Sequence, residues 1–213
     1  GAVKARINRY AQMKADDIFN ANFKPGDLTI TFTFEKEKRP KSSDELQNFW
    51  KKYIRKCRRA YKRAGKVFKW QKGIDDNENN PHIHAAFSAI DISLLPAWPY
   101  GKMHITPVDD RENHTFGSYA QKQGKEDNGK KKLKGRTIQN YSHSRNLIIP
   151  EPRYKVIGND HWAEEPRAPK GYYVVKDSIQ NWDDKINGYK HQSYIILPLP
   201  DKAGKRSSRR ARR

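Results

Sequence analysis

The sequence has few acidic residues and almost no cysteine, and it lacks long hydrophobic runs. Its 24 Asp and Glu stand against 44 Lys and Arg, so the 213 residues carry a formal net charge of +20. The single cysteine, Cys57, excludes an internal disulfide and a cysteine-rich zinc site. No segment resembles a signal peptide or a membrane span. We therefore expect a soluble protein with no membrane partner, compatible with a reducing cytoplasm.

The excess of positive charge indicates the class of partner. A net charge of +20 destabilises a compact chain by self-repulsion, and a polyanion offsets it most readily. Aromatic residues make up 11% of the chain, including five Trp and eleven Tyr, and unpaired bases can stack on such rings. The composition therefore favours single-stranded nucleic acid as a partner over a basic protein that is merely soluble.

Several segments have the alternation or turn signals of β-strands. In residues 28–34, Leu28, Ile30, Phe32 and Phe34 are separated by single threonines, which predicts a strand with one buried face. Residues 67–71 indicate a second strand. A polar loop over residues 75–80 then turns the chain back into a third strand that begins at His82. Residues 102–107 indicate a fourth.

A helix is predicted to begin at Ser42, because Ser42 and Glu45 have the spacing of a capping box. Apolar residues then recur at helical spacing, with Cys57 among them as a core residue, and Gly65 is predicted to end the helix. The opposite face carries eight basic residues, and it is either solvated or in contact with phosphates. They are Lys51, Lys52, Arg55, Lys56, Arg58, Arg59, Lys62 and Arg63.

The remaining segments suggest the domain organisation. Residues 1–24 form a leader in which Ile7, Tyr10 and Met13 have the spacing of one face of a short helix, and residues 109–124 indicate another helix. The main domain covers residues 25–150. A C-terminal appendage packed on that domain covers residues 151–204, with strands at 171–175 and 193–197, and a disordered basic tail covers residues 205–213. The order of elements predicts an α+β fold, a central antiparallel sheet with helices on one face, as in ferredoxin-like and RNA-recognition domains.

The third strand begins with His82-Ile83-His84. Side chains alternate along a strand, so both imidazoles project from one face while Ile83 points into the core. Two imidazoles on one face provide half of a divalent-metal site. The same pattern is also found where a surface strand simply carries two histidines.

Tyr119 and Lys122 are three residues apart in the second predicted helix, and so lie on one of its faces. A phenol has an ordinary pKa of about 10, so a tyrosine that attacks phosphorus needs a cation or metal to stabilise its phenolate. A metal at the two histidines and the Lys122 ammonium would supply that charge. A surface tyrosine packed on a lysine stem has the same spacing.

The strand at residues 28–34, the His-Ile-His strand and the Tyr-Ala-Gln-Lys segment at 119–122 occur in an order that resembles the three motifs of the HUH endonuclease superfamily, the rolling-circle replication initiators. The similarity is greatest to the group of filamentous-phage gene-two and spiroplasma-virus replication proteins. Residues 98–101 (Trp-Pro-Tyr-Gly) and 141–146 also look like that group. The resemblance covers roughly residues 28–150.

The resemblance implies a site-specific DNA endonuclease and strand transferase with an HUH-type ferredoxin-like fold. His82 and His84 would bind Mg²⁺ or Mn²⁺. Tyr119 would attack one phosphodiester of single-stranded origin DNA, leaving a free 3′-hydroxyl and a 5′-phosphotyrosine for later rejoining, and Lys122 would position or neutralise the phosphate. The expected location is the host cytoplasm, or the nucleus of a eukaryotic host, with host replication proteins as candidate partners.

The resemblance also implies a third metal ligand on the strand before the two histidines, where this chain has Gln71. Its amide oxygen is a weak neutral ligand for a hard cation, and Asp76 or Glu78 in the following loop are alternatives.

Candidate DNA-binding residues are Lys125, Lys130 and Lys131 in a Gly/Lys-rich loop, and Arg145, which could instead pair with Glu151.

Two other functions are compatible with the same residues. A non-catalytic module that binds single-stranded nucleic acid would use the histidines for stacking or pairing. A metal-dependent nuclease that activates water would need the metal but would form no bond between DNA and tyrosine.

Overall fold

The structure is a computed structural model, and it describes residues 2–108, 116, 132–135, 141–151, 153, 163–183 and 188–199. By its internal contacts the chain forms two units. The main unit is Lys4–Pro152, and the second unit comprises Gly1–Val3 and Arg153–Arg213.

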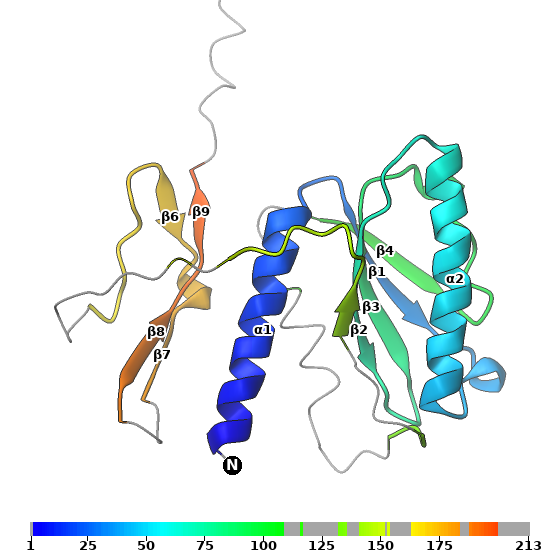
Figure 1. Cartoon of the computed structure of the whole chain (residues 1–213), viewed down its shortest axis with the longest axis horizontal. Helices are drawn as coiled ribbons and strands as arrows, with labels where there is room; N and C mark the ends of the chain where they lie inside the picture. Colours follow the sequence, from blue (N-terminus) through cyan, green and yellow to red (C-terminus); the bar gives the residue numbers. More distant parts are fainter. Residues whose placement is uncertain are drawn as a thin grey trace, which may run out of the picture. The chain divides into compact units, whose positions relative to one another are not determined.

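The main unit is built on a five-stranded sheet in the order β4-β1-β3-β2-β5, with antiparallel pairing throughout. The first four strands have the 4-1-3-2 order of ferredoxin-like domains, which confirms the predicted α+β fold class with a central antiparallel sheet (Figure 1). Pairing with β2 creates the fifth strand, which was not predicted. The strands are β1 (Leu28–Thr33), β2 (Trp70–Asp75), β3 (His82–Phe87), β4 (Met103–Pro107) and β5 (Tyr141–His143).

Helix α2 (Ser43–Arg63) has the predicted signals at both ends. The Ser42 hydroxyl oxygen accepts a hydrogen bond from the Glu45 N–H at 3.2 Å. At the other end Gly65 has φ +64°, a conformation that favours glycine, and the Lys66 N–H donates to the Tyr61 carbonyl at 2.9 Å. Local chemistry therefore fixes the start and the end of this helix.

One face of the sheet packs against α2 and forms the larger hydrophobic core. Phe32 of β1 lies at its centre, with ring centroids 5.7 Å from Trp50, 5.1 Å from Tyr53 and 5.1 Å from Trp98, all at steep angles. Such edge-to-face pairs are favourable beyond their buried area. Cys57 is fully buried there, as predicted for a core residue.

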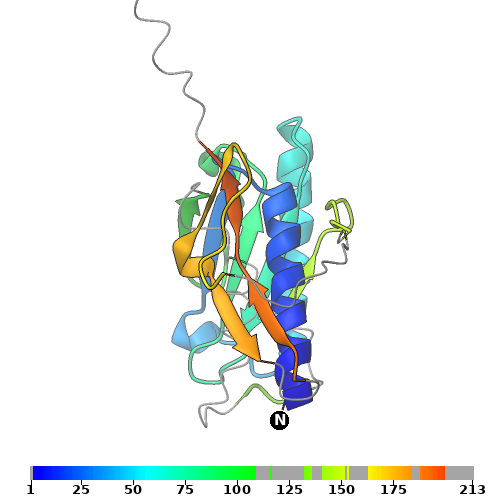
Figure 2. The same cartoon turned by 90° about the vertical axis from the view of Figure 1, so that its left-hand side faces the viewer.

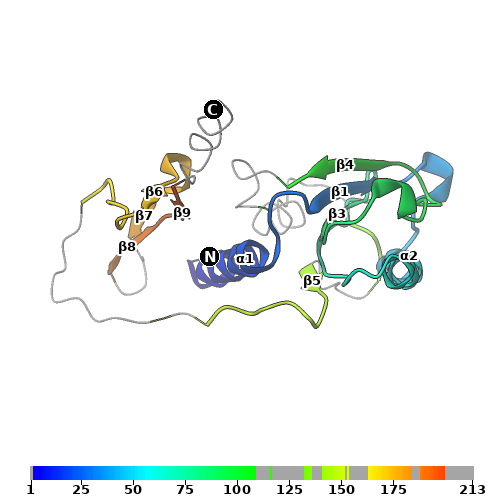
Figure 3. The same ribbon diagram turned by 90° about the horizontal axis from the view of Figure 1, so that it is seen from above.

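Helix α1 (Ala2–Asn22) lies on the other side of the sheet from α2 (Figures 1 and 3). The predicted placement of the helices on one face was therefore wrong, because both faces of the sheet carry apolar residues that a helix covers. It packs Ile18 and Phe19 against Ala86 of β3, whose side chain points away from the α2 core. The predicted apolar face was wrong in its position, because Tyr10 is 68% exposed and Met13 is 41% exposed. The buried face lies farther along the helix.

Strand β2 differs from the prediction of a strand at residues 67–71. It begins at Trp70 and continues to Asp75, while Val67 is exposed. The predicted strand ended too early because Lys72 occupies a core-facing position opposite Ala85, where the alternating pattern calls for an apolar residue. Lys72 is 1% exposed, its Nζ lies 5.8 Å from the centroid of the Trp50 ring, and it makes no hydrogen bond with any described residue.

The second unit contains two small antiparallel ribbons (Figure 2). Strand β6 (Tyr172–Val174) pairs with β9 (Ile196–Pro198), and β7 (Gln180–Asp183) pairs with β8 (Lys190–Ser193). The strand at 171–175 is thus confirmed, the one at 193–197 only in part, and the β7–β8 hairpin was missed. Three short 3-10 helices complete the described elements: η1 (Lys36–Lys38), η2 (Ile92–Leu94) and η3 (Lys176–Ser178).

The buried Lys72 ammonium leads to a prediction about stability. Burial lowers the pKa of Lys72 from its ordinary value of 10.5 to about 7. Between these values the unfolded chain holds a proton that the folded chain lacks, so the free energy of unfolding should rise with pH from about 7 to 10.5. Lys72→Met should raise that free energy by about 2–4 kcal/mol at pH 7 and remove this slope.

Urea unfolding at several pH values measures both effects. Lys62→Met, on the exposed face of α2, is the matched control and should change stability by less than about 0.5 kcal/mol. A Lys72→Met protein that is less stable than the wild type at pH 7 would contradict this account.

Candidate active site on the polar face of the sheet

Pairing between β1, β3 and β2 sets the neighbours of the two histidines. His82 lies between Thr33 and Asp75, whereas His84 lies between Thr31 and Gly73. Side chains directly opposite each other in a sheet share a face, so these residues project together, away from the α2 core. We call this surface the histidine face. It consists of Thr29, Thr31, Thr33, Gln71, Gly73, Asp75, His82, His84, Ala86, His104, Thr106, Tyr141 and His143.

The hydrogen bonds of His82 determine which of its ring nitrogens carries the proton. Its Nδ1 lies 2.9 Å from the Asn80 carbonyl oxygen, which can only accept, so Nδ1–H is the donor. In the neutral ring Nε2 therefore carries the lone pair. This is the tautomer of a metal-binding histidine whose second nitrogen is held by a backbone carbonyl.

His84 is more deeply buried than His82 and is 5% exposed. Its Nδ1 lies 3.1 Å from the Thr31 hydroxyl oxygen, and the two imidazole centroids are 4.8 Å apart. Burial, with a smaller contribution from His82, lowers the pKa of His84 to about 4. His84 is therefore neutral at physiological pH, the form in which imidazole binds metals.

Asp75 is the carboxylate that lies directly opposite His82. Its Oδ2 is 3.8 Å from His82 Nε2, and its Oδ1 accepts a hydrogen bond from the Asn77 N–H at 3.0 Å. The turn after β2 thus orients one carboxylate oxygen toward the imidazole. Sequence reasoning proposed the neighbouring Asp76 and Glu78 instead. Asp76 is buried, which raises its pKa, and Glu78 is exposed.

Gln71 is on the histidine face but lies opposite Ala86 rather than opposite a histidine. It is completely buried, and its Nε2 donates to the Ala15 carbonyl of α1 at 2.9 Å. Its Oε1 accepts no hydrogen bond from any described residue. The amide group therefore attaches α1 to the sheet, and its oxygen is a buried acceptor beside the histidines.

Tyr141 is a second residue that sequence reasoning did not place at the site. It lies opposite Gly73, which in turn lies opposite His84. Burial and the Asp16 carboxylate raise the pKa of Tyr141, and the nearby Gln71 amide offsets only part of this rise. Its phenolate is thus disfavoured, which makes Tyr141 a poor nucleophile.

The predicted nucleophile Tyr119 and its neighbour Lys122 lie outside the described residues, as do Lys125, Lys130 and Lys131. Arg145 is exposed in the turn after β5 and, within the described part of the chain, forms no ion pair with Glu151.

Phe116 is described, and it locates part of the predicted tyrosine helix. It is helical and 7% exposed, and its ring stacks on Phe19 of α1 with centroids 5.1 Å apart. The same hydrophobic cluster contains Ala86, two residues from His84 on the histidine face. The chain at residue 116 is therefore packed at this face.

The donors around His82 and His84 are their two imidazoles, the Asp75 carboxylate and the Gln71 amide oxygen. His104 and His143 lie on the same face, opposite Thr31 and Gln71. Mixed nitrogen and oxygen donors suit Mn²⁺, and Mg²⁺ prefers the oxygens. The donor set fits such a cation in its chemistry. However, no three His, Cys, Asp or Glu side chains converge as a group that could hold a metal ion among the residues that the structure describes.

Comparisons with known proteins found no relative: no family model matches the chain, and no curated protein or solved structure matches it significantly. Among the helices that the structure describes, none has both the length and the apolar character needed to cross a membrane.

The geometry favours Asp75 over Gln71 as the residue that would complete a metal site with the histidines, and this can be tested with Mn²⁺. A ligand at 100 times its Kd stabilises by about 2.7 kcal/mol, which corresponds to a rise in Tm of about 5–10 °C. We expect this rise in the wild type and its loss in Asp75→Asn. Gln71→Leu should retain most of it, although its metal-free Tm should fall because the bond to Ala15 is lost.

Thermal unfolding with and without Mn²⁺ measures each rise relative to the same variant without metal. Asp183→Asn, an exposed carboxylate of the second unit, is the matched control. A rise that persists in Asp75→Asn and disappears in Gln71→Leu would reverse the assignment.

Proposed function

We propose that this protein is a replication initiator that nicks and rejoins single-stranded DNA through a covalent bond to Tyr119. The observation that carries the proposal is the histidine face, where a neutral, buried imidazole and a tautomer-fixed imidazole lie next to a carboxylate. The net charge of +20 supports a nucleic-acid partner. The resemblance of the motifs and their order supports the reaction.

Phe116 supports the choice of Tyr119 as nucleophile. Its packing beside Ala86 attaches this segment to the histidine face, and Tyr119 is three residues farther along the chain. Three residues span at most about 11 Å, so the chain keeps the tyrosine close to this attachment point. The described alternative, Tyr141, has a raised pKa, which disfavours its phenolate.

In the proposed reaction the Tyr119 oxygen forms a bond to phosphorus, and the bond from phosphorus to the 3′-oxygen breaks. The phenol proton is passed on to the departing 3′-oxygen, so the products are a 3′-hydroxyl and a 5′-phosphotyrosine. The new bond is itself a phosphodiester, and attack by a 3′-hydroxyl reverses the step and rejoins DNA. Lys122 would neutralise charge on the phosphate.

His82, His84 and Asp75 would hold the Mn²⁺ or Mg²⁺ ion, with the Gln71 oxygen nearby. A bound cation supplies Lewis-acid stabilisation of charge on the phosphate oxygens. The protein contributes the tautomer of His82 through Asn80 and the neutral state of His84 through burial. Both properties follow from the fold itself.

A second candidate function is a non-catalytic module that binds single-stranded nucleic acid. It is favoured by the lack of a three-residue metal-binding group among the described residues. Such a module would use the same sheet and the same charge. It would not need Tyr119, so the two functions differ in a covalent product.

The test is to incubate the protein with Mn²⁺ and a random pool of single-stranded oligonucleotides and to examine it on a denaturing gel. We expect a covalent protein–DNA species with the wild type and none with Tyr119→Phe or with EDTA. His84→Gln should lower the yield by about 100-fold or more, because metal binding is lost. Tyr141→Phe is the matched control and should form the adduct.

The alternative functions predict different products on the denaturing gel. Cleavage that survives Tyr119→Phe would overturn the covalent mechanism in favour of activated water. Binding without cleavage of any pool member would overturn nicking and favour the binding module.

A further inference from the structure

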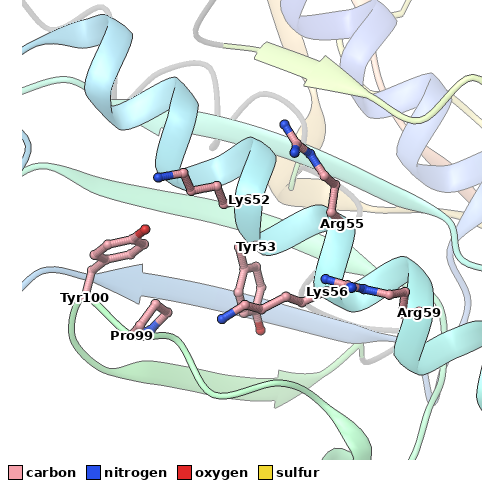
Figure 4. Close-up of a pocket in the computed structure, with 7 residues that line it drawn as sticks. All are labelled: Lys52, Tyr53, Arg55, Lys56, Arg59, Pro99 and Tyr100. Carbon is pink, nitrogen blue, oxygen red and sulfur yellow. The ribbon is translucent and has the colours of Figure 1, made fainter.

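A groove in the main unit lies between α2 and the loop before β4, on the side of the sheet opposite to the histidine face. It has a volume of about 230 Å³. Figure 4 shows Tyr53 and Lys56 projecting from α2 toward Pro99, with Tyr100 at one end of the groove and Arg55 pointing away from Pro99. The lining residues are Lys52, Tyr53, Arg55, Lys56, Arg59, Pro99 and Tyr100.

The floor and one wall of the groove are held in place by aromatic packing and by hydrogen bonds to backbone carbonyls. The buried Tyr53 hydroxyl donates to the Pro96 carbonyl at 3.0 Å. The Tyr100 ring stacks on Phe49 with centroids 3.9 Å apart and planes 16° apart. The Tyr100 carbonyl accepts from the Glu35 N–H at 2.8 Å.

Gly101 allows the loop to lie this close to β1. A Cβ atom at position 101 would overlap the Thr33 carbonyl oxygen and lie 2.9 Å from the Phe34 Cα atom. These are backbone atoms that cannot move aside cheaply. The groove is therefore a preformed feature of the fold, and it needs little ordering to accept a ligand.

The charge of the groove is of one sign. Four of its seven lining residues are Lys or Arg, and none of these seven described residues carries a carboxylate. Within the described part of the chain, none of the four cations forms an ion pair. Lys52, Lys56 and Arg59 form a stripe along α2 that is about 10 Å long, at 1.5 Å per residue.

We propose that this groove binds the sugar–phosphate backbone of nucleic acid. The stripe is long enough to contact about three phosphates of one strand, which are about 3.4 Å apart along the axis, and each cation can neutralise one. The exposed Pro99 and the half-buried Tyr100 provide flat apolar surfaces against which sugars or an unpaired base can pack. Contacts between these cations and phosphates carry no sequence information, so we expect binding in the groove to be independent of sequence.

This inference rests on nucleic acid being the partner, as proposed above, but not on nicking. Because the groove and the histidine face are on opposite sides of the sheet, they would contact different parts of the DNA. The groove would hold DNA that flanks the segment at the histidine face. Its contribution is affinity and not chemistry.

The test compares two triple variants of α2 in a Tyr119→Phe background, which separates binding from cleavage. The groove variant is Lys52→Gln/Lys56→Gln/Arg59→Gln. The control is Lys51→Gln/Arg58→Gln/Lys62→Gln, which removes the same charge from a different stripe of the same helix. These three positions are exposed and do not line the groove.

Fluorescence anisotropy with a labelled single strand of about 40 nucleotides is measured at several salt concentrations. The groove variant should bind about 10- to 100-fold more weakly than the control at about 0.1 M salt. Its slope of log K against log salt should be smaller than that of the parent by about 2–3, at roughly 0.7–0.9 per lost phosphate contact. The control should keep most of the parent slope.

Equal affinities and slopes in the two triple variants would overturn the proposal that the groove binds DNA, while leaving the proposed function intact. A parent protein that binds no oligonucleotide would overturn both. Binding of the parent to anionic lipid vesicles, lost in the groove variant while DNA binding is kept, would assign the groove to a membrane surface and overturn the proposal. Circular dichroism of both variants checks that α2 remains folded.

Discussion

The structure of the main unit depends on the antiparallel register of β1, β3 and β2. Because side chains alternate, each residue of these strands contributes either to the α2 core or to the histidine face. A shift of β3 by one residue against β1 and β2 would exchange its two sets of side chains and place His84 against the aromatic core. Burial of Phe32, Ile83 and Ile74 on the core side therefore also holds the polar side in register.

Helix α2 has two opposed functions in this account. Its apolar stripe encloses the aromatic cluster around Phe32, and its other stripes carry eight basic residues without a carboxylate after Glu45. The same helix that stabilises the register of the sheet thus presents positive charge away from it. Lys72 of β2 does not follow this separation of basic and apolar groups, because its amino group lies inside the core beside Trp50.

The elements that could be predicted from the sequence are those defined by local signals. The alternation in β1 and the capping box at Ser42 are read within a few residues, and both agree with the structure. The position of β2 was wrong because Lys72 interrupts the apolar pattern. Strand β5 and the buried face of α1 depend on contacts with distant segments, which no local pattern records.

The site was partly predictable for the same reason. His82 and His84 share a face whenever their segment is a strand, so their spacing alone was sufficient to predict that they lie together. To predict that Asp75 lies beside His82, one must know the register of the β2–β3 hairpin. The sequence did hold a signal, because Gln71 and Asp75 are four residues apart and must share a face once β2 is extended to residue 75. The position of Tyr141 on the histidine face could not be predicted from the sequence, because it depends on the pairing of β5 with β2.

The central claim is that one tyrosine of the predicted second helix becomes bonded to DNA, and peptide mapping of the adduct tests it most directly. The protein is reacted with single-stranded DNA and Mn²⁺, the DNA is trimmed with nuclease, and tryptic peptides are sequenced by mass spectrometry. The account predicts a nucleotide on the phenolic oxygen of Tyr119 and on no other residue. A nucleotide on Tyr141, or cleaved DNA with no modified peptide, would contradict it.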